Sequence, residues 1–369
     1  MSISHMSNQY ARGTISATKP FIPPVDEYQN MVAEIMNGGW LTNQGPCVVE
    51  LEEKLKKIFN VEYLLLVTNG TIAIQMALKA MKIQGEVITT PYSYVATTSS
   101  LLWENCVPRF CDIDPNTFNI DASKLKGLLT NETKAILATN VYGYPCQMEA
   151  IQNFADEHGL KVIYDSAHCF GTKVNEESIM TFGDISTISF HATKLFHTVE
   201  GGAIVCKSKE IYEQLKLLRN FGHTSPTTFG SMGINAKMNE FSAAMGLVNL
   251  NYVNEIMIRR KSQWDLYQEL LAEIGLHGAS YELEFNKAYF PLVLKSEEFL
   301  LCVLTEMEKE NIHLRRYFYP SLNELDFLPI YDACPISEDI SRRVICLPLY
   351  HELTESDMRF IIQKLGSLC

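Results

Sequence analysis

The chain reads Ile185-Ser-Thr-Ile-Ser-Phe-His-Ala-Thr-Lys194-Leu-Phe-His-Thr-Val-Glu-Gly201-Gly202, with one lysine between two apolar runs. Hydroxyl side chains precede this lysine, and a Glu-Gly-Gly turn follows it. Such a lysine is well placed to reach into a pocket from a loop that two strands hold. There a deprotonated amine can form an imine with an aldehyde. The stretch therefore predicts a covalent bond at Lys194, although a loop lysine taken alone is more often a solvated surface charge.

An apolar run over residues 162–164 ends in the carboxylate of Asp165, and His168 follows three residues later. In open α/β sheets, ligands sit beyond the carboxyl ends of the strands, so Asp165 marks the place where a ligand is expected. A lysine and a strand-end aspartate are the minimal pair for holding pyridoxal phosphate, whose pyridinium nitrogen needs an acidic partner. Each residue alone has a simpler interpretation, with Asp165 as a turn cap and His168 as a structural histidine.

Four further residues stand at strand ends or loops. Gly70 and Thr71 follow an expected strand and open an expected helix, whose free N–H groups can bind a phosphate. Ser189 ends another strand and can donate to the same phosphate, and Tyr94 can stack on a flat ring. A plain capped turn and a buried core tyrosine are the alternatives. The conjunction of these features in one chain order favours a cofactor site over independent structural roles.

The composition limits the classes of function. Apolar types make up 47% of the 369 residues, enough for one large and one small domain with their own cores. No apolar run approaches the roughly 18 residues of a membrane-spanning helix, and residues 1–12 lack the apolar core of a signal peptide. Ten cysteines without CxxC pairs or Cys/His metal spacing favour free thiols in a reducing cytoplasm and no metal site. A net charge of −12 argues against nucleic-acid binding.

Strand-like apolar runs alternate with helical periodicity between about residues 50 and 206, which predicts an α/β domain with a mostly parallel sheet. The expected strands cover residues 63–67, 87–90, 108–112, 135–138, 161–165, 185–190 and 203–206. After Asn239 the pattern is long and helical, and short apolar runs return at 288–294 and 344–349. We therefore expect a polar N-terminal tail over residues 1–18, a large domain over 19–250 and a small C-terminal domain over 251–369.

Taken together, these segments resemble the sugar aminotransferases of the DegT/DnrJ/EryC1/StrS family, which are fold-type-I pyridoxal-phosphate enzymes. The resemblance runs from about Lys19 to the end of the chain. Its markers are Gly39-Trp40-Leu-Thr42 with Gly45-Pro46, Asn69-Gly70-Thr71, Thr90-Pro-Tyr-Ser-Tyr94-Val-Ala-Thr97, Asp165-Ser-Ala-His168, Ser189-Phe-His-Ala-Thr-Lys194 with Glu200-Gly-Gly202, Gly233-Ile-Asn235-Ala-Lys-Met238 and Leu347-Pro348. The resemblance implies a large domain with a mostly parallel seven-stranded sheet flanked by helices, and a smaller C-terminal α/β domain.

By the resemblance, Lys194 carries the Schiff base of pyridoxal 5'-phosphate, and Asp165 pairs with the pyridine nitrogen. His168 is expected near the cofactor's phenolic oxygen, and Tyr94 is expected to stack on the ring. Residues 191–193 read His-Ala-Thr where a proline is common in the family, so we expect a less rigid loop there.

The resemblance also implies the contacts of the phosphate and the substrate. Gly70, Thr71 and Ser189 are expected to hold the cofactor phosphate. Asn235 is expected to reach the phosphate of the neighbouring subunit, because family members build each site across a homodimer interface. Substrate contacts are expected from Trp40, Thr42, Lys237, Tyr317 and Tyr319, and which of the two tyrosines occupies the pocket stays open. Further candidates for the substrate's diphosphate are Arg219, Lys237, Arg259, Arg260, Arg315 and Arg316.

The implied reaction converts a nucleotide-linked keto sugar to an amino sugar, with L-glutamate as amino donor. Similarity around residues 191–197 favours dTDP-4-keto-6-deoxy-D-glucose and a 4-amino-4,6-dideoxy product, of a kind used in lipopolysaccharide O-antigens. Amination at C3 of a dTDP-3-keto-6-deoxyhexose is the alternative. A sugar dehydratase is disfavoured because resembling dehydratases carry histidine in place of Lys194. A non-catalytic sensor of pyridoxal phosphate or a nucleotide sugar is the rival from another class, and no added sensor domain is visible in the sequence.

Overall fold

The structure, a computed structural model, describes residues 13–368 of the chain. Its centre is a seven-stranded sheet in the order β2-β10-β9-β6-β5-β3-β4. The strands are β2 (Tyr63–Val67), β3 (Glu86–Thr89), β4 (Val107–Phe110), β5 (Thr133–Thr139), β6 (Lys161–Asp165), β9 (Ile185–Ser189) and β10 (Gly202–Cys206). Only β10 is antiparallel to its neighbours. The prediction of a mostly parallel seven-stranded sheet is confirmed, with strand bounds within two residues of those expected.

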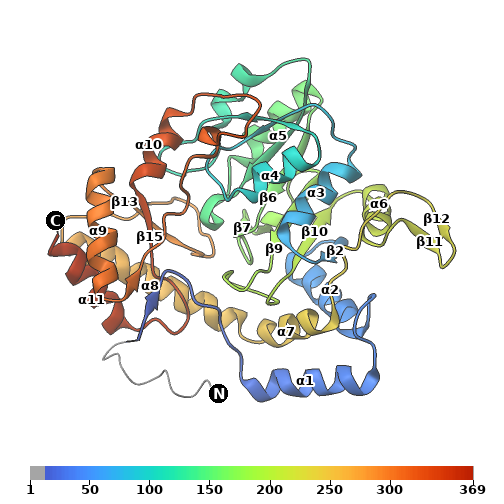
Figure 1. The fold of residues 1–369 in the computed structure, drawn as a ribbon, viewed down its shortest axis with the longest axis horizontal. Coiled ribbons are helices and arrows are strands. Elements are labelled where there is room, and N and C mark those ends of the chain that lie inside the picture. The colour runs from blue at the N-terminus through green and yellow to red at the C-terminus, as the bar shows by residue number, and fades with distance from the viewer. Residues whose placement is uncertain (1–12, 369) are drawn as a thin grey trace.

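Helices cover both faces of this sheet, and the alternation of side chains along a strand explains why both faces are apolar. In β2, Leu64 and Leu66 join a core with helices α2 (Pro46–Phe59), α5 (Met148–His158) and α7 (Glu240–Leu250). Leu65 and Val67 point to the other face, where α3 (Gly70–Ala80), α4 (Ala96–Trp103) and α6 (Lys209–Arg219) complete a second core (Figure 1). The predicted α/β architecture therefore follows from strands that are buried on both sides.

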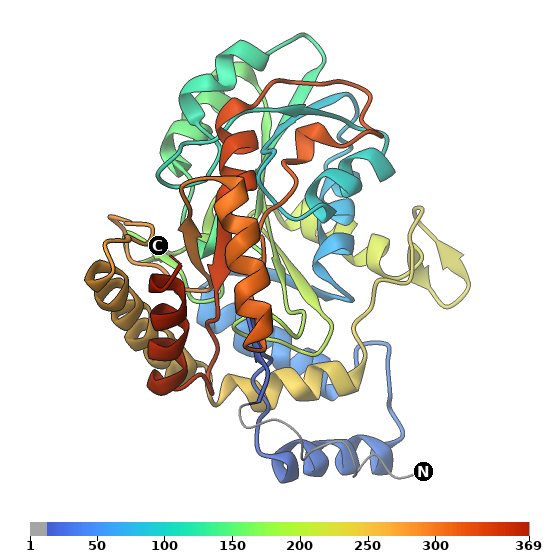
Figure 2. The same ribbon diagram turned by 60° about the vertical axis from the view of Figure 1, so that its left-hand side comes forward.

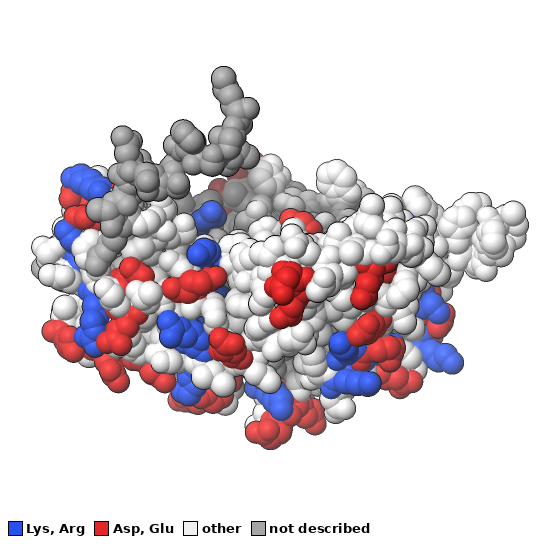
Figure 3. Space-filling view, turned by 90° about the horizontal axis from the view of Figure 1, so that it is seen from below, with Lys and Arg blue, Asp and Glu red and all other residues white. Residues whose placement is uncertain are grey.

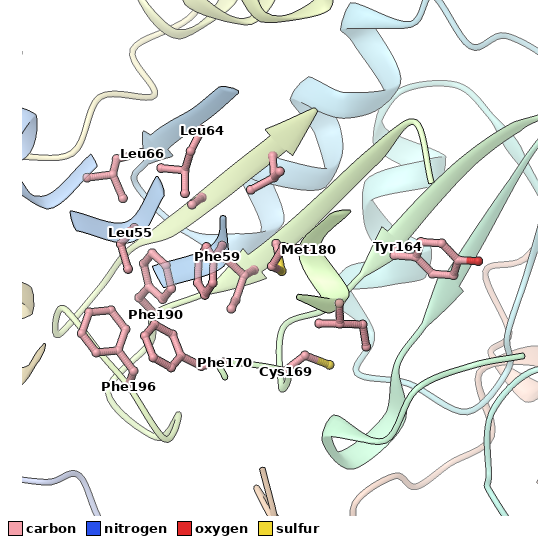
Figure 4. Close-up of a cluster of buried hydrophobic side chains, with 14 of the residues drawn as sticks. Leu55, Phe59, Leu64, Leu66, Tyr164, Cys169, Phe170, Met180, Phe190 and Phe196 are labelled. Carbon is pink, nitrogen blue, oxygen red and sulfur yellow. The ribbon is translucent and has the colours of Figure 1, made fainter. Parts of the chain in front are cut away.

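Four phenylalanines form a cluster beside the sheet (Figure 4). The ring of Phe196 lies 4.4 Å from that of Phe170 and 5.0 Å from that of Phe190, measured between centroids. Phe59 of α2 packs edge-on against Phe170 at 5.3 Å. Because Phe190 and Phe196 flank Lys194 in sequence, the cluster anchors both ends of the loop that carries the lysine. The loop that lacks the family's proline is thus held by aromatic packing.

The C-terminal part has its own core, built on the long helix α8 (Val253–Glu273). Its remaining elements are β13 (Phe290–Val293), α9 (Glu297–Lys309), β14 (Ile312–His313), α10 (Pro335–Arg343), β15 (Val344–Leu347) and α11 (Glu355–Gly366), with β13 antiparallel to β15. The expected boundary at residues 250–251 falls between α7 and α8.

The expected tail over residues 1–18 needs a correction. Residues 1–12 lie outside the described part, but β1 (Ile15–Ser16) pairs in parallel with β14, because Ile15 is buried in the C-terminal core.

Two features extend from the large domain. Helix α1 (Val25–Gly38) lies along α7 at its edge (Figures 1 and 2). The hairpin of β11 (His223–Ser225) and β12 (Thr228–Phe229) projects from the body in both views. The short remaining elements are β7 (Lys173–Val174), β8 (Glu177–Ser178), η2 (Ala122–Leu128), η3 (Val141–Gly143), η4 (Ile179–Thr181) and η5 (Leu322–Glu324). Within residues 13–368, no helix has the length and apolar character needed to cross a membrane.

Candidate active site

A cavity of about 330 Å³ opens at the carboxyl ends of β5, β6 and β9 and at the start of α3. This is where the strand arrangement of an open α/β sheet predicts a ligand. Seven of the eight predicted cofactor residues line it, although they come from segments up to 124 positions apart: Gly70, Thr71, Tyr94, Asp165, His168, Ser189 and Lys194. The fold therefore brings together the residues that the sequence motifs singled out.

Lys194 lies in the irregular segment after β9, half-buried, with its Nζ 3.5 Å from the hydroxyl oxygen of Tyr289. Burial lowers the pKa of the Lys194 ammonium, and the nearby carboxylate of Asp165 partly opposes this effect. Desolvation disfavours the charged form of a lysine, so the neutral amine is more populated here than on a surface. A neutral amine is the form that can attack an aldehyde or remove a proton.

Asp165 is the last residue of β6 and is 6% exposed. Its Oδ2 accepts a hydrogen bond from Thr97 Oγ1 at 2.8 Å, and its Oδ1 accepts one from the Ala167 N–H at 3.1 Å. Burial raises the pKa of this carboxyl, while both hydrogen bonds and the charge of Lys194 oppose the rise. In the described part of the chain, only neutral donors hydrogen-bond to this buried carboxylate, so its negative charge is available to a cationic partner. The protonated ring nitrogen of pyridoxal phosphate is such a partner.

His168 is buried, and its Nδ1 has no hydrogen-bond partner among the described residues. Burial and the nearby charge of Lys194 hold the pKa of His168 well below its usual range, so the ring is neutral. The ring of Phe318 stacks parallel to it with centroids 5.8 Å apart. An orphaned buried polar atom is costly unless a ligand completes it. A polar oxygen of a bound cofactor would satisfy this nitrogen.

The start of α3 forms the phosphate end of the cavity. Asn69 Oδ1 caps the helix by accepting from the Ile72 N–H at 2.9 Å, so the amides of Gly70 and Thr71 remain at the positive end of the helix. A Cβ on Gly70 would come 2.9 Å from the Cβ of Ser189, which means that only glycine lets the helix start approach β9 this closely. The ring of Tyr94 is 61% exposed at the cavity. These features fit a flat ring that carries a phosphate.

The structure explains the glycines of the Glu-Gly-Gly turn that follows Lys194. A Cβ on Gly202 would lie 2.7 Å from the carbonyl carbon of Asn69. The start of β10 therefore passes directly against the residue that precedes the helix start, and glycine is required for this approach.

The two candidate tyrosines separate clearly. Tyr317 lines the cavity, and the Tyr142 hydroxyl donates to its carbonyl oxygen. Tyr319 does not line the cavity, and its ring packs under the guanidinium of Arg316, 3.4 Å from its centroid. Of the six basic candidates for the diphosphate, Arg315 alone lines the cavity.

Besides Tyr319, four residues that were predicted to contact the cofactor or the substrate lie outside the cavity of their own chain. Asn235 is exposed at the base of the β11–β12 hairpin, and Lys237 donates to Asn220 Oδ1 at 3.0 Å. Trp40 and Thr42 are exposed beyond the end of α1, where Trp40 Nε1 donates to the Thr42 carbonyl at 2.6 Å. These positions leave them free for contacts outside the single chain.

Sequence reasoning missed two residues. Thr97, which donates a hydrogen bond to Asp165, stood inside a quoted motif, but no spacing in that motif connects it with Asp165. Tyr289 enters the cavity from the linker before β13, and no motif connects it with Lys194. Only the packing of the two domains reveals it.

The sequence pattern of the DegT/DnrJ/EryC1/StrS aminotransferase family matches residues 25–366. The dTDP-4-amino-4,6-dideoxy-D-glucose transaminase of Shigella dysenteriae is 39% identical over 363 residues, which cover 96% of this chain and 99% of that protein. The Escherichia coli enzyme of the same name is 36% identical over 370 residues, covering 93% and 95%. The solved structure of DesI in the presence of its TDP-sugar product has a TM-score of 0.91 at 30% identity, covering 96% of this chain and 92% of that one.

Proposed function

The chain belongs to the DegT/DnrJ/EryC1/StrS aminotransferase family of sugar aminotransferases, and we propose that it moves the amino group of L-glutamate to C4 of dTDP-4-keto-6-deoxy-D-glucose. The product would be dTDP-4-amino-4,6-dideoxy-D-glucose. The main support for this reaction is that Lys194 and Asp165 line the same cavity. The choice of substrate is supported by the 39% identity to the Shigella dysenteriae transaminase over nearly the whole of both chains.

The cofactor that we propose for this cavity is pyridoxal 5'-phosphate. When bound, it supplies an aldehyde that carries the amino group and a ring that takes up negative charge. Lys194 would hold the aldehyde, and Asp165 would keep the ring nitrogen protonated. Lys194 Nζ would also be the base that removes the α-proton of the amino donor.

The same cavity offers the remaining contacts of the cofactor. The amides of Gly70 and Thr71 and the hydroxyl of Ser189 would bind the phosphate. His168 Nδ1 would meet the phenolic oxygen, and the exposed ring of Tyr94 would cover the cofactor ring. All of these residues line the cavity, so the proposal needs no rearrangement of the backbone.

We propose that Arg315 and Tyr317 meet the anionic part of the substrate. Within residues 13–368, the Arg315 side chain is within salt-bridge distance of no carboxylate, and its guanidinium lies 5.7 Å from the ring of Tyr317. An unneutralised arginine beside a cavity suits a diphosphate or a carboxylate, which it can bind through two parallel N–H groups.

The active unit would be a homodimer in which each subunit completes the other's site. The segments that carry Trp40, Thr42, Asn235 and Lys237 also expose apolar side chains, which are Trp40, Leu41, Phe221, Phe229, Met232 and Ile234. The molecule seen from below carries charges of both signs over its body, while its right-hand end, where the β11–β12 hairpin projects, is uncharged (Figure 3). Exposed apolar groups of this extent are typical of interfaces. Asn235 and Lys237 would thus reach the partner's phosphate groups.

A second opening supports this arrangement. A cavity of about 450 Å³ is lined by Asn69 and Thr71 at the phosphate end and by Met238 and Asn239 before α7. It shares Asn69, Thr71 and Glu200 with the main cavity, so a residue of the partner could approach the phosphate from this side.

The reaction is tested by incubating the protein with glutamate and dTDP-4-keto-6-deoxy-D-glucose and identifying the sugar by NMR. Amination at C4 is expected, and parallel reactions use a dTDP-3-keto isomer and a GDP-linked 4-keto sugar. Faster turnover of either alternative would overturn the proposed substrate. A yellow protein that bleaches with glutamate is expected at the first step, whereas indifference to every amino donor would instead favour a sensor.

The shared site is tested by mixing two inactive variants, Lys194→Ala and Asn235→Asp, after brief unfolding and refolding together. If Asn235 serves the partner's site, half of the dimers are mixed and each has one intact site, so about a quarter of the wild-type rate should return. The matched control mixes Lys194→Ala with Asp165→Ala, which act in the same chain and should give no recovery. Recovery in the control, or none in the test, would contradict the arrangement.

Two broader assignments rest on this reaction. We propose that the amino sugar is consumed by glycosyl transfer into a polysaccharide such as a lipopolysaccharide O-antigen. We also propose a cytoplasmic location, which is supported by the nine described cysteines, all of them free thiols that a reducing compartment preserves.

A further inference from the structure

Tyr289 is the residue immediately before β13, and it is 6% exposed. Its hydroxyl oxygen lies 3.5 Å from Lys194 Nζ, and no other side chain among residues 13–368 hydrogen-bonds to that amine. The contact joins the C-terminal domain to the loop after β9, two segments that the sequence separates by 95 positions.

The linker over residues 286–289 is fastened on one side by Asn286. Asn286 Nδ2 donates to the carbonyl oxygens of His168 at 2.6 Å and Phe170 at 2.9 Å, and its Oδ1 accepts from the Ala288 N–H at 3.1 Å. A Cβ on Gly143 would come 2.2 Å from that Oδ1, so glycine is needed to seat the amide. The linker is thus tied to the loop that also carries a predicted cofactor ligand.

Arg260 of α8 fastens the other side. Its Nη1 donates to the Ala288 carbonyl at 2.9 Å, and the side chain is 4% exposed. Because Ala288 is bonded through both its N–H and its carbonyl, the backbone that carries Tyr289 is defined on either side. A hydroxyl placed by such a backbone is preorganised, which is what a group at a reacting centre requires.

Aromatic rings fix the direction of the Tyr289 side chain. Its ring centroid lies 4.8 Å from that of His168, 5.5 Å from that of Tyr317 and 6.0 Å from that of Tyr142. Burial raises the pKa of Tyr289 far above its ordinary value, so the phenol stays protonated. Its oxygen can therefore accept a hydrogen bond from an amine without becoming a base itself.

We propose that Tyr289 is a second catalytic residue of the aminotransfer reaction, whose hydroxyl oxygen holds the Lys194 amine in place while that amine carries a proton. This inference rests on the proposed function. As the neutral amine, Nζ takes a proton from the α-carbon of the donor, so that a C–H bond breaks and a third N–H bond forms. It then gives the same proton to carbon or water. Tyr289 accepts a hydrogen bond from Nζ throughout and loses no proton, so atoms and charge balance.

Other titratable groups also interact with the Lys194 amine and contribute to its pKa. They are Tyr94, Asp165, His168, Cys169 and Tyr317. A substitution that removes one hydroxyl and leaves these five in place isolates the Tyr289 contribution.

The test compares Tyr289→Phe with Tyr267→Phe. Tyr267 is also buried in the C-terminal part, and its hydroxyl donates to the Pro348 carbonyl at 2.9 Å, so both variants lose one buried hydrogen bond. In single-turnover measurements of the glutamate step at saturating donor, Tyr289→Phe should slow the reaction about tenfold or more. Tyr267→Phe should leave that rate unchanged, and both variants should bind the cofactor.

A second measurement needs no turnover. The cofactor-free proteins are labelled with trace acetic anhydride across a pH series, and acetylation at Lys194 is quantified by mass spectrometry to give the pKa of its amine. Loss of an acceptor for the ammonium should lower that pKa by about half a unit to one unit in Tyr289→Phe, with no change in Tyr267→Phe. Wild-type values of both the rate and the pKa in Tyr289→Phe would overturn the inference. Because the labelling uses no substrate, a wrong sugar assignment would leave this result intact and show itself only in the amination assay.

Discussion

Replacing Asp165 by asparagine should make the cofactor-free protein more stable and the enzyme far less active. The side chain is buried, and the two neutral donors that contact it, Thr97 Oγ1 and the Ala167 N–H, do not neutralise its charge. Exchanging two charge-assisted hydrogen bonds for neutral ones loses about 1 kcal/mol each. Removing a buried charge recovers several kcal/mol of desolvation. The net gain in the free energy of unfolding should be about 1–3 kcal/mol near neutral pH.

The gain should depend on pH with a defined sign. Because burial raises the pKa of Asp165 in the folded chain, the folded state binds this proton more tightly than the unfolded state does. Its charge therefore costs no stability below the unfolded pKa of about 4, and the cost grows as the pH rises to the folded value and stays constant above it. The difference between wild type and Asp165→Asn should accordingly shrink in acid.

The catalytic rate of Asp165→Asn should fall, although its stability rises. Asparagine cannot stabilise a protonated ring nitrogen as an anion does, and removing one such preorganised electrostatic group costs about 10²–10³-fold in kcat. The assay combines urea unfolding of the cofactor-free protein at pH 7 and in acid with single-turnover rates of the glutamate step.

Asp184, the residue before β9, provides a matched control because it contacts the opposite end of β6. Asp184 accepts from the Val162 N–H at 2.9 Å and from Lys161 Nζ at 3.0 Å, and its side chain is 26% exposed. Asp184→Asn should lose stability and keep its activity, because this carboxylate is paired and far from the cavity. A destabilised Asp165→Asn, or one that retains more than about a tenth of the wild-type rate, would refute the reasoning.

Lys194→Ala should abolish turnover and the visible absorbance of the bound cofactor; measurable transamination by this variant would place the covalent bond elsewhere. Gly70→Ala should weaken cofactor binding about tenfold or more in a fluorescence titration, because its Cβ would come 2.9 Å from a carbon of the facing strand. The control Gly127→Ala, with no atom within 4 Å of its Cβ, should bind normally, and equal affinities would show that the close approach is irrelevant. Arg315→Gln should raise KM about tenfold for the substrate whose anion it binds, with little change in kcat, as measured separately for glutamate and the nucleotide sugar. Arg359→Gln in α11 provides the exposed control, and unchanged KM values for both substrates in Arg315→Gln would remove Arg315 from the site.

Much of the large domain was predictable because local chemistry and the final fold agree there. The runs at residues 63–67 and 162–164 are apolar without interruption, which is the pattern of strands buried on both faces, and the strands expected at 63–67 and 161–165 have the same bounds in the structure. Asn69 followed by a glycine is a local signal for a capped helix start after a strand. The N-terminal segment was different. Residues 13–18 look polar and unstructured in isolation, yet Ile15 is buried because a strand from near residue 312 lies beside it.

The sequence alone was enough to predict the strands of the sheet, the roles of Lys194 and Asp165, and the helix start at Gly70. Each of these features is marked by a pattern of residues within a few positions of it. Tertiary packing decided which tyrosine enters the cavity, that Tyr289 meets the lysine amine, and that Asn235 and Lys237 face away from their own site. The outcomes for the two tyrosines depend on how the C-terminal domain docks on the sheet, a contact between segments about a hundred residues apart that leaves no periodicity or spacing in the sequence.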